Sequence, residues 1–453
     1  MGWFRPGKSW RLGTVISLLS LVATLAACGG GSGTGGTGGG VKGPKNALVA
    51  CPQSTNSSAA DAESGNITLN VSGWSSSPAE DALVTKGFQD FSKKYPNITV
   101  KWSPIPDAYD TKMRANVAAG NVADVFYVQP AMAQEYTKAG KLLNLSPYMA
   151  RDNVSPDSFY SSLMTPFDCA DGSVFGIPKD WNSLGLFYNK TMFQQAGLGD
   201  PSSWTWDDLT SAAQKLTKSK VAGLSLPPDA SRWGAFLFAN GGQILSADGK
   251  KAAFNNDAGV KATEFYTAFE KSKTGVIPKD VGAGWDGEAF GKQQAAMTFE
   301  GGWMIPYMSS TFASVQYGIA PMPAAPNGQR ANLLYTNAWG AYSGTKHADA
   351  AWKLIQFMTS AEHQQQVLQD GFALPTVKSL ESDPYFTQNP GVKVLQDGAK
   401  VGHADFYGPA DTKIHSEIAT ALESIMLGKA SVQDALNTAA NNVDTYIQQN
   451  VGP

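Results

Sequence analysis

The sequence predicts an α/β protein whose sheets are mostly parallel and flanked by helices. Three observations support this prediction: a length of 453 residues suits two or three domains, 42 % hydrophobic residues can form a sizeable core, and strand and helix patterns alternate along the chain. The net charge of −3 contains no basic excess that could neutralise phosphates. This charge balance argues against a dedicated nucleic-acid-binding protein.

The opening residues have the pattern of an export signal. Arg5, Lys8 and Arg11 precede an apolar run over Val15–Leu25, which is shorter than the ~20 residues that a membrane-spanning helix needs. Leu-Ala-Ala then stands directly before Cys28, an arrangement similar to a bacterial lipobox, in which the thiol carries the lipid and the cysteine becomes the mature N-terminus. The alternative is an ordinary signal peptide with a chance cysteine.

Residues 1–27 are therefore predicted to be removed, and residues 28–65 to form a lipid-anchored tether. Within the tether, nine of the twelve residues in 29–40 are glycine, a composition that does not pack and that gives a flexible link. Removal of the signal takes away three positive charges and changes the net charge from −3 to −6. Folded structure is expected from about Asn66 onwards.

The other two cysteines, Cys51 and Cys169, are candidates for a disulfide. Outside the cytoplasm, two cysteines that are left over after lipidation can pair. The alternative is that they stay free, because Cys51 lies within the predicted tether.

After Asn66 the chain alternates between strand and helix patterns. Short apolar runs predict strands, and apolar residues at helical spacing, such as Leu83, Phe88 and Phe91, predict helices. The expected strands are 67–71, 98–102 and 124–128, and the expected helices are 78–94, 108–119 and 130–139. This order predicts a mostly parallel sheet with helices on both faces.

The same alternation resumes after residue 184. Thr205 followed by Asp208 has the spacing of a capping box, which predicts the start of a helix. The expected strands of this half are 185–188 and 294–299, and the other expected helices are 258–271, 348–358, 414–426 and 432–448.

Several spacings that mark metal and cofactor sites are missing. The four histidines form no HExxH pattern, no CxxC pair is present, and no GxGxxG turn opens a helix after a predicted strand. We therefore expect no metal and no cofactor. A carboxylate pair for glycoside hydrolysis stays open, because Asp and Glu residues are abundant.

Four segments occur in a fixed order through the predicted folded region. They are 176–190 (GIPKDWNSLGLFYNK), 203–209 (SWTWDDL), 240–242 (NGG) and 290–303 (FGKQQAAMTFEGGW). In order and spacing they resemble the sugar-binding family of extracellular solute-binding proteins of ABC importers, which is related to maltose-binding protein. Each segment alone is a weak signal, but together they extend the resemblance over residues 66–453.

The resemblance implies a two-lobed periplasmic-binding-protein-like fold, in which hinge crossings join two lobes that close around a ligand. Each lobe is expected to hold a mostly parallel sheet flanked by helices. Lobe one is expected at 66–178 with 325–370, and lobe two at 183–320 with 376–453. The crossings are expected near 178–183, 320–325 and 371–376.

The resemblance also implies where a ligand is held. Sugars present C–H faces that stack on aromatic rings, while carboxylate and amide groups bind their hydroxyls. Asp180 lies in the first crossing, where the alternative role is a hinge salt bridge, and for Trp233 a place in the core is the favoured alternative. The expected ligand-binding residues are Trp74, Gln129, Asp180, Trp233, Trp303, Asn337, Trp339 and Tyr407.

These expectations combine into one hypothesis. The chain is expected to be a monomeric, extracytoplasmic binding subunit, anchored to the membrane through Cys28, that captures a carbohydrate and delivers it to the membrane subunits of an ABC permease. An oligosaccharide is the favoured ligand; abundant aromatic residues and unclustered arginines favour neutral sugars over anions. Two alternatives stay open: a secreted glycan-cleaving enzyme, and a binding protein for a polyamine, an organic phosphate or a metal complex.

Overall fold

The computed structural model describes residues 56, 58–75, 78–169 and 171–451. All of these residues belong to one unit, residues 43–453, which is distinct from the unit formed by residues 1–42. The predictions for the export signal, for lipidation of Cys28 and for the glycine-rich part of the tether lie outside the described residues, and so does Cys51. In the described part, no helix is both long and apolar enough to cross a membrane.

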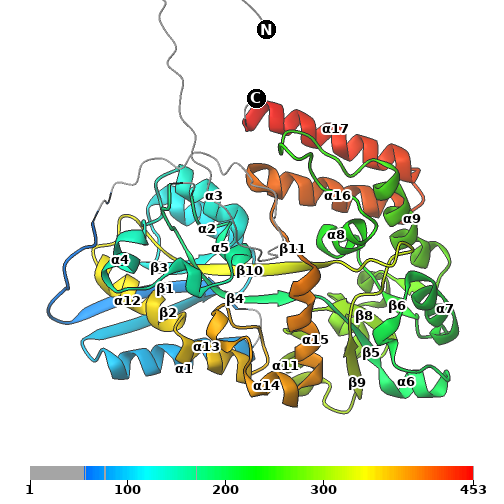
Figure 1. Cartoon of the computed structure of the whole chain (residues 1–453), viewed down its shortest axis with the longest axis horizontal. Helices are drawn as coiled ribbons and strands as arrows, with labels where there is room; N and C mark the ends of the chain where they lie inside the picture. The colour runs from blue at the N-terminus through cyan, green and yellow to red at the C-terminus, as the bar shows by residue number, and fades with distance from the viewer. Residues whose placement is uncertain (1–55, 57, 76–77, 170, 452–453) are drawn as a thin grey trace, which may run out of the picture. The chain divides into compact units, whose positions relative to one another are not determined.

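Lobe one is built on a six-stranded sheet in the order β11-β10-β3-β1-β2, with β4 paired to β10 (Figure 1). β1 runs parallel to β2 and β3, whereas β10 runs antiparallel to β3 and β4. The strands are β1 (Ile67–Trp74), β2 (Ile98–Ile105), β3 (Val125–Val128), β4 (Ile177–Ser183), β10 (Asn332–Ala341) and β11 (Gly402–Ala404). The helices are α1 (Pro78–Lys94), α2 (Tyr109–Ala119), α3 (Pro130–Lys138), α4 (Ser146–Arg151), α5 (Ser161–Met164), α12 (Ala348–Met358) and α13 (Ala361–Gln369).

Lobe two is built on a five-stranded sheet in the order β7-β6-β8-β5-β9. β5 runs antiparallel to β8 and β9, whereas β6 runs parallel to β7 and β8. The strands are β5 (Gly185–Asn189), β6 (Leu224–Ser225), β7 (Gly275–Val276), β8 (Met297–Glu300) and β9 (Tyr317–Ala320). The helices are α6 (Lys190–Gln195), α7 (Trp206–Leu216), α8 (Ala230–Ala239), α9 (Asp257–Lys271), α10 (Asp286–Gly291), α11 (Met304–Thr311), α16 (Asp411–Met426) and α17 (Val432–Asn450). Two further helices follow α13: α15 (Pro390–Asp397) lies beside β4 and β9, and α14 (Pro384–Gln388) contacts α15.

Each lobe has its own hydrophobic core. The core of lobe one gathers buried side chains of β1, β3, α1 and α12, and that of lobe two gathers those of α7, α8, α9, α16 and α17. Ala325, Ala331 and Leu333 pack in the core of lobe two, although we had expected the segment from 325 to belong to lobe one. The chain therefore passes from lobe two to lobe one along β10, because Ala338 and Trp339 of the same strand pack in the core of lobe one.

Three crossing segments lie side by side between the lobes. β4 pairs antiparallel with β10, and Thr336 Oγ1 donates to the Asp180 carbonyl at 2.9 Å. The third segment, 371–376, pairs with β4 through reciprocal hydrogen bonds of Trp181 and Leu374, at 3.0 and 2.8 Å. A crossing made of paired extended chains can flex along its length while the flanking sheets stay rigid, which is the geometry of a hinge.

Both sheets contain antiparallel pairs beside the expected parallel ones, so they are mixed. Parallel pairs occur where a helix connects the strands, as α1 does between β1 and β2. The antiparallel pairs β3 with β10 and β5 with β8 join strands that are far apart in the chain, so no single local connection fixes their direction.

The segment just before β1 is packed on lobe one rather than being part of the tether. Asn56 Nδ2 donates to the Asn144 carbonyl at 3.0 Å, and Arg151 donates to the Ala60 carbonyl at 3.1 Å. Glu63 forms an ion pair with His347 at 2.7 Å. Ordered structure therefore starts before residue 66, because polar anchors replace the apolar periodicity that a sequence pattern can detect.

Candidate functional site

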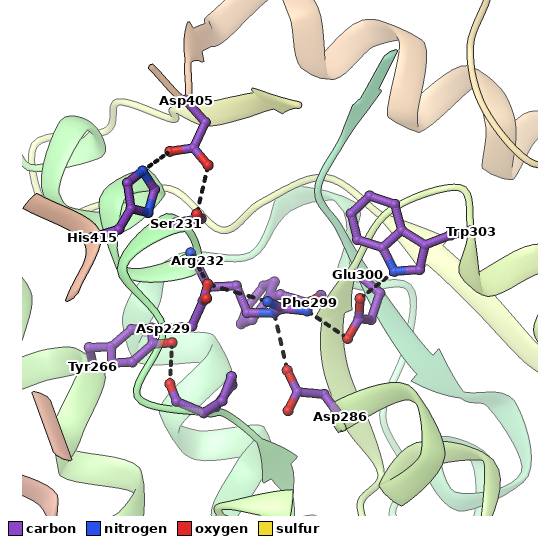
Figure 2. Close-up of polar contacts among 11 residues, drawn as sticks. Asp229, Ser231, Arg232, Tyr266, Asp286, Phe299, Glu300, Trp303, Asp405 and His415 are labelled. Atoms are coloured by element: carbon purple, nitrogen blue, oxygen red, sulfur yellow. Dashed lines mark hydrogen bonds and ion pairs between the residues drawn. The ribbon is translucent and has the colours of Figure 1, made fainter. Parts of the chain in front are cut away.

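Lobe two contains a network of charged side chains that is centred on Arg232 (Figure 2). Asp229 is the N-cap of α8, and its carboxylate accepts a hydrogen bond from the Arg232 backbone nitrogen at 2.8 Å. This cap fixes Arg232 in the first turn of α8, where its guanidinium donates to Glu300 at 2.8 Å. The same guanidinium donates to the Phe299 carbonyl at 3.0 Å and pairs with Asp286 at 3.1 Å.

Burial shapes the charges of this network. Glu300 is fully buried at the end of β8, and Asp286 is buried at the start of α10. Burial raises the pKa of both carboxyl groups, and the nearby Arg232 opposes this rise. The Arg232 pKa is raised well above its usual value, because Glu300 and Asp286 outweigh the cost of its own burial. The guanidinium therefore stays charged and holds both carboxyl groups in place.

Trp303 is the aromatic side chain that this network holds. It follows Gly301 and Gly302 at the start of α11, and its indole nitrogen donates to the second oxygen of Glu300 at 2.7 Å. The indole remains partly exposed. It meets the ring of Tyr335, on the crossing strand β10, edge to face at 5.7 Å between ring centroids. Trp303 thus stands where lobe two meets the hinge.

Further acidic groups lie on the other side of α8. Asp405 accepts a hydrogen bond from Ser231 at 2.6 Å and lies 3.4 Å from His415, which is also 3.7 Å from Asp411. Burial raises the pKa of Asp405, and raises that of Asp411 to about 6. Burial alone would lower the pKa of His415, but Asp405 and Asp411 outweigh it, so the pKa of this histidine is raised. Tyr407 stacks obliquely on His415, with 5.5 Å between the ring centroids.

Lobe one contributes a second group of aromatic rings around a buried lysine. Lys179 of β4 lies 4.6 Å from the ring centroid of Tyr127 and 5.5 Å from that of Trp74. Its ammonium group pairs with Asp180, and with Glu80 of α1 at 3.4 Å. Burial by itself lowers the pKa of Lys179, but the two carboxylates outweigh burial and the pKa is raised. The lysine thus ties the first helix of lobe one to the hinge.

Two of the expected ligand-binding residues, Gln129 and Asn337, carry amide side chains. Gln129 is the N-cap residue of α3, and its amide nitrogen, when placed toward Asp110, donates to both carboxylate oxygens at 2.8 and 3.0 Å. Asn337 is partly exposed on β10, in register with Asp180. Both side chains are partly accessible, so both can offer an amide group to a ligand.

A groove with a volume of about 450 Å³ lies between the lobes. Lobe one lines it with α2 and α3, including Arg114 and Glu135, which pair at 3.1 Å. Lobe two lines it with α16, α17 and the short 3₁₀ turn η6 (Gly408–Ala410), which contacts α3. The described residues that line this groove include none of the expected ligand-binding residues.

The expected ligand-binding residues divide into accessible and buried ones. Trp74, Gln129, Trp303, Asn337 and Tyr407 are partly exposed. Their contact with a ligand stays a prediction.

The other three residues occupy structural positions. Trp233 is fully buried in the core of lobe two and donates to Thr263 at 2.9 Å, and Trp339 is buried against Tyr127 in lobe one. Asp180 forms the salt bridge with Lys179 that was its alternative role. Asp180 and Trp339 line a small cavity of about 20 Å³ beside Lys179. Contact of any of these three residues with a ligand stays a prediction.

Sequence reasoning did not select the residues that organise the site. Arg232, Lys179 and Tyr335 are absent from the expected set, although Arg232 and Lys179 are direct neighbours of chosen residues. The only sequence signal for Arg232 was its place three residues after Asp229, the spacing of a helix cap. Its partners Asp286 and Glu300 are more than fifty residues away in the chain, so the network is visible only after folding.

Among the described residues, no group of three or more His, Cys, Asp or Glu side chains is arranged to hold a metal ion. Cys169 is disulfide-bonded. The pairing with Cys51 stays a prediction, since that residue lies outside the described part.

The sequence also matches a known family. Residues 74–365 match the family described as bacterial extracellular solute-binding protein. The chain belongs to this family. The match runs from the end of β1 into α13 and includes parts of both lobes and the crossing strands β4 and β10. The protein is therefore a two-lobed, extracytoplasmic solute-binding protein rather than an enzyme.

Individual relatives and solved structures match this solute-binding protein over most of its length. The galactooligosaccharide-binding protein of Bacillus subtilis is 24 % identical over 425 residues, which are 89 % of this chain and 94 % of that protein. An ABC substrate-binding protein from Listeria monocytogenes, solved in complex with cycloalternan, superposes with a TM-score of 0.78 at 23 % identity and covers 84 % of this chain and 99 % of its own. A protein from Mycobacterium tuberculosis, solved in complex with glycerophosphocholine, superposes with a TM-score of 0.75 at 20 % identity and covers 86 % of this chain and 100 % of its own.

Proposed function

We propose that this solute-binding protein captures a carbohydrate, with an oligosaccharide as the favoured ligand, for an ABC importer. The observation that carries the proposal is Trp303, a partly exposed indole clamped by Glu300 at the edge of the hinge. A fixed, partly exposed aromatic face suits a sugar ring, because the C–H faces of sugars stack on aromatic rings. The galactooligosaccharide-binding relative from Bacillus subtilis supports the same ligand class.

Capture is proposed to work by closure of the lobes around the hinge. Trp303 belongs to lobe two, Trp74 and Gln129 belong to lobe one, and Tyr335 lies on the crossing strand between them. A ligand that touches all of them binds the closed state more tightly than the open state. It shifts the population by that difference in affinity, and no other source of energy is needed.

The membrane partner and the anchor complete the proposal. We infer that the closed form docks on the membrane subunits of a permease, which take up the released sugar. Lipidation of Cys28 would hold the protein at the membrane surface through the segment that precedes lobe one. The sequence pattern at Cys28 supports this anchor, and intact mass spectrometry of protein from membranes would test it by the mass of an attached diacylglyceryl group.

A ligand screen tests the function. The mature protein would be mixed with oligosaccharides, monosaccharides, polyamines and glycerophosphodiesters, and its melting temperature would be followed. A ligand at 100 times its dissociation constant stabilises the folded state by about 2.7 kcal/mol, a shift that is readily measured. Stabilisation by oligosaccharides without their cleavage is the expected result. Stabilisation by polyamines or phosphodiesters alone would contradict the sugar assignment, and turnover of a glycan would contradict the assignment as a binding protein.

Truncation of Trp303 tests the site. Trp303→Ala removes the stacking face and is expected to weaken oligosaccharide binding at least tenfold, as measured by calorimetry. Trp285→Ala is the matched control, because Trp285 is a partly exposed tryptophan of the same lobe that packs on Tyr307. Equal affinity losses in both variants would indicate general destabilisation rather than loss of a ligand contact.

A further inference from the structure

The two carboxylate oxygens of Glu300 accept hydrogen bonds from two different donors (Figure 2). One oxygen accepts from Arg232 at 2.8 Å, and the other accepts from the Trp303 indole nitrogen at 2.7 Å. The residue is fully buried. Glu300 therefore has no face left to offer to a solute, although it is adjacent to the best candidate for a stacking residue.

Arg232 is in turn fixed from several sides. Besides Glu300 it contacts the Phe299 carbonyl, Asp286 and Asp229, at 3.0, 3.1 and 3.3 Å. These groups come from β8, α10 and the cap of α8. A guanidinium held by three separate elements cannot rotate away, so the Glu300 carboxylate that it grips is also fixed.

The glycine pair before Trp303 makes this arrangement possible. A Cβ atom at Gly301 would lie 2.4 Å from the Trp303 ring, so only glycine lets the indole fold back toward Glu300. A Cβ atom at Gly302 would lie 2.6 Å from Asn182 Oδ1, which instead accepts a hydrogen bond from the Gly302 nitrogen at 2.8 Å. Asn182 belongs to the crossing strand β4. The indole is thus fixed both to the interior of lobe two and to the hinge.

We propose that Glu300 and Arg232 are positioning residues that fix the plane of the Trp303 indole before a ligand arrives, and that ligand affinity depends on this fixation. The proposal rests on the proposed function, because it takes Trp303 as the stacking face. A free indole would lose rotational freedom on binding, which costs about 3- to 10-fold in affinity for one immobilised side chain. Glu300 acts through Trp303 and makes no contact with the ligand itself.

The variant Glu300→Gln tests the proposal, because an amide has one acceptor and one donor end. It cannot accept from Arg232 and from Trp303 at the same time. Glu264→Gln is the matched control, because Glu264 is exposed on α9 of the same lobe. Trp303→Phe removes the indole N–H while keeping an aromatic ring, and it supplies a second variant if Glu300→Gln does not fold.

The first measurement needs no ligand. In protein labelled with ¹⁵N-tryptophan, the indole N–H signal that is missing in Trp303→Phe identifies Trp303. Its hydrogen exchange with solvent is expected to be slow in the wild type and in Glu264→Gln, and at least tenfold faster in Glu300→Gln. Unchanged exchange in Glu300→Gln would overturn the proposal whatever the ligand is.

The second measurement is a double-mutant cycle of oligosaccharide affinity. Glu300→Gln is expected to weaken binding about 3- to 10-fold in the wild-type background and less than twofold in the Trp303→Phe background. Equal losses in both backgrounds would overturn the positioning role, since Glu300 would then act independently of the indole. If the wild type binds no carbohydrate but the exchange result is as expected, the proposed function fails while the fixation of the indole stands.

Discussion

Replacement of Lys179 by methionine is expected to destabilise lobe one. Lys179 is buried on β4 and neutralises two carboxylates, Asp180 beside it and Glu80 on α1. Methionine keeps most of the volume and the apolar stem but removes the charge. The variant therefore leaves two buried carboxylates without their shared cation.

The magnitude follows from the geometry. Two unit charges 3.4 Å apart, the distance from Lys179 to Glu80, interact by about 5 kcal/mol at an effective dielectric constant of about 20. Removal of the buried lysine recovers part of this interaction energy, because the ammonium group no longer has to be desolvated. The net loss expected on breaking a buried pair is about 3–5 kcal/mol. For a chain of this length that corresponds to about 3–6 °C in melting temperature.

The assay is thermal unfolding by circular dichroism at neutral pH. Lys179→Met with Asp180→Asn should recover part of the loss. Lys93→Met is the control, because Lys93 is 76 % exposed in its pair with Asp90. Its replacement should lower the free energy of unfolding by less than about 1 kcal/mol.

Two results would refute the reasoning. Wild-type stability of Lys179→Met at pH 7 would mean that the buried lysine contributes no net electrostatic stabilisation. A loss that Asp180→Asn does not reduce in the Lys179→Met background would assign the effect to packing around Tyr127 and Trp74 rather than to charge.

Three further predictions concern other parts of the fold. Gly302→Ala should lower both stability and ligand affinity, because the added methyl group would lie 2.6 Å from the Asn182 side chain. Calorimetry of the wild type and the variant would measure both losses. Unchanged stability and affinity would mean that the crossing strand shifts freely to make room. Burial raises the Asp411 pKa to about 6, so the folded state binds this proton more tightly than the unfolded state and stability should fall as pH rises from about 4 through 6. Asp411→Asn should flatten that fall in a pH series of melting temperatures, and an unaltered slope would assign it to other groups such as His415. Thr205→Ala should cost about 0.5–2 kcal/mol by removing the capping box of α7, and a denaturant titration that shows no loss would contradict this.

Much of the local structure could be predicted because it depends on neighbours in the sequence. Helices α1 and α12 occur with the bounds that apolar periodicity predicts, and the Thr205 capping box forms as expected. The first crossing coincides with β4, where the segment that resembles the family lies. These features need only side chains within a few positions of each other.

The candidate site was predicted less well, because its accessible and buried tryptophans look alike in sequence. Trp303 follows two glycines and Trp233 follows an arginine, yet one is partly exposed at the hinge and the other is fully buried on Thr263. Exposure depends on what packs against a side chain from distant parts of the chain. No local pattern carries that information.

The sequence by itself determined the alternation of strands and helices, the export and lipidation pattern, and membership in a family of solute-binding proteins. Only the tertiary structure decided that the sheets are mixed, that residues 325–333 belong to lobe two, and that Arg232 and Glu300 fix Trp303. The physical reason is the range of the interactions. Helix periodicity and capping act over three or four residues, whereas strand direction, burial and the charge network arise between segments that meet only when the chain crosses between lobes.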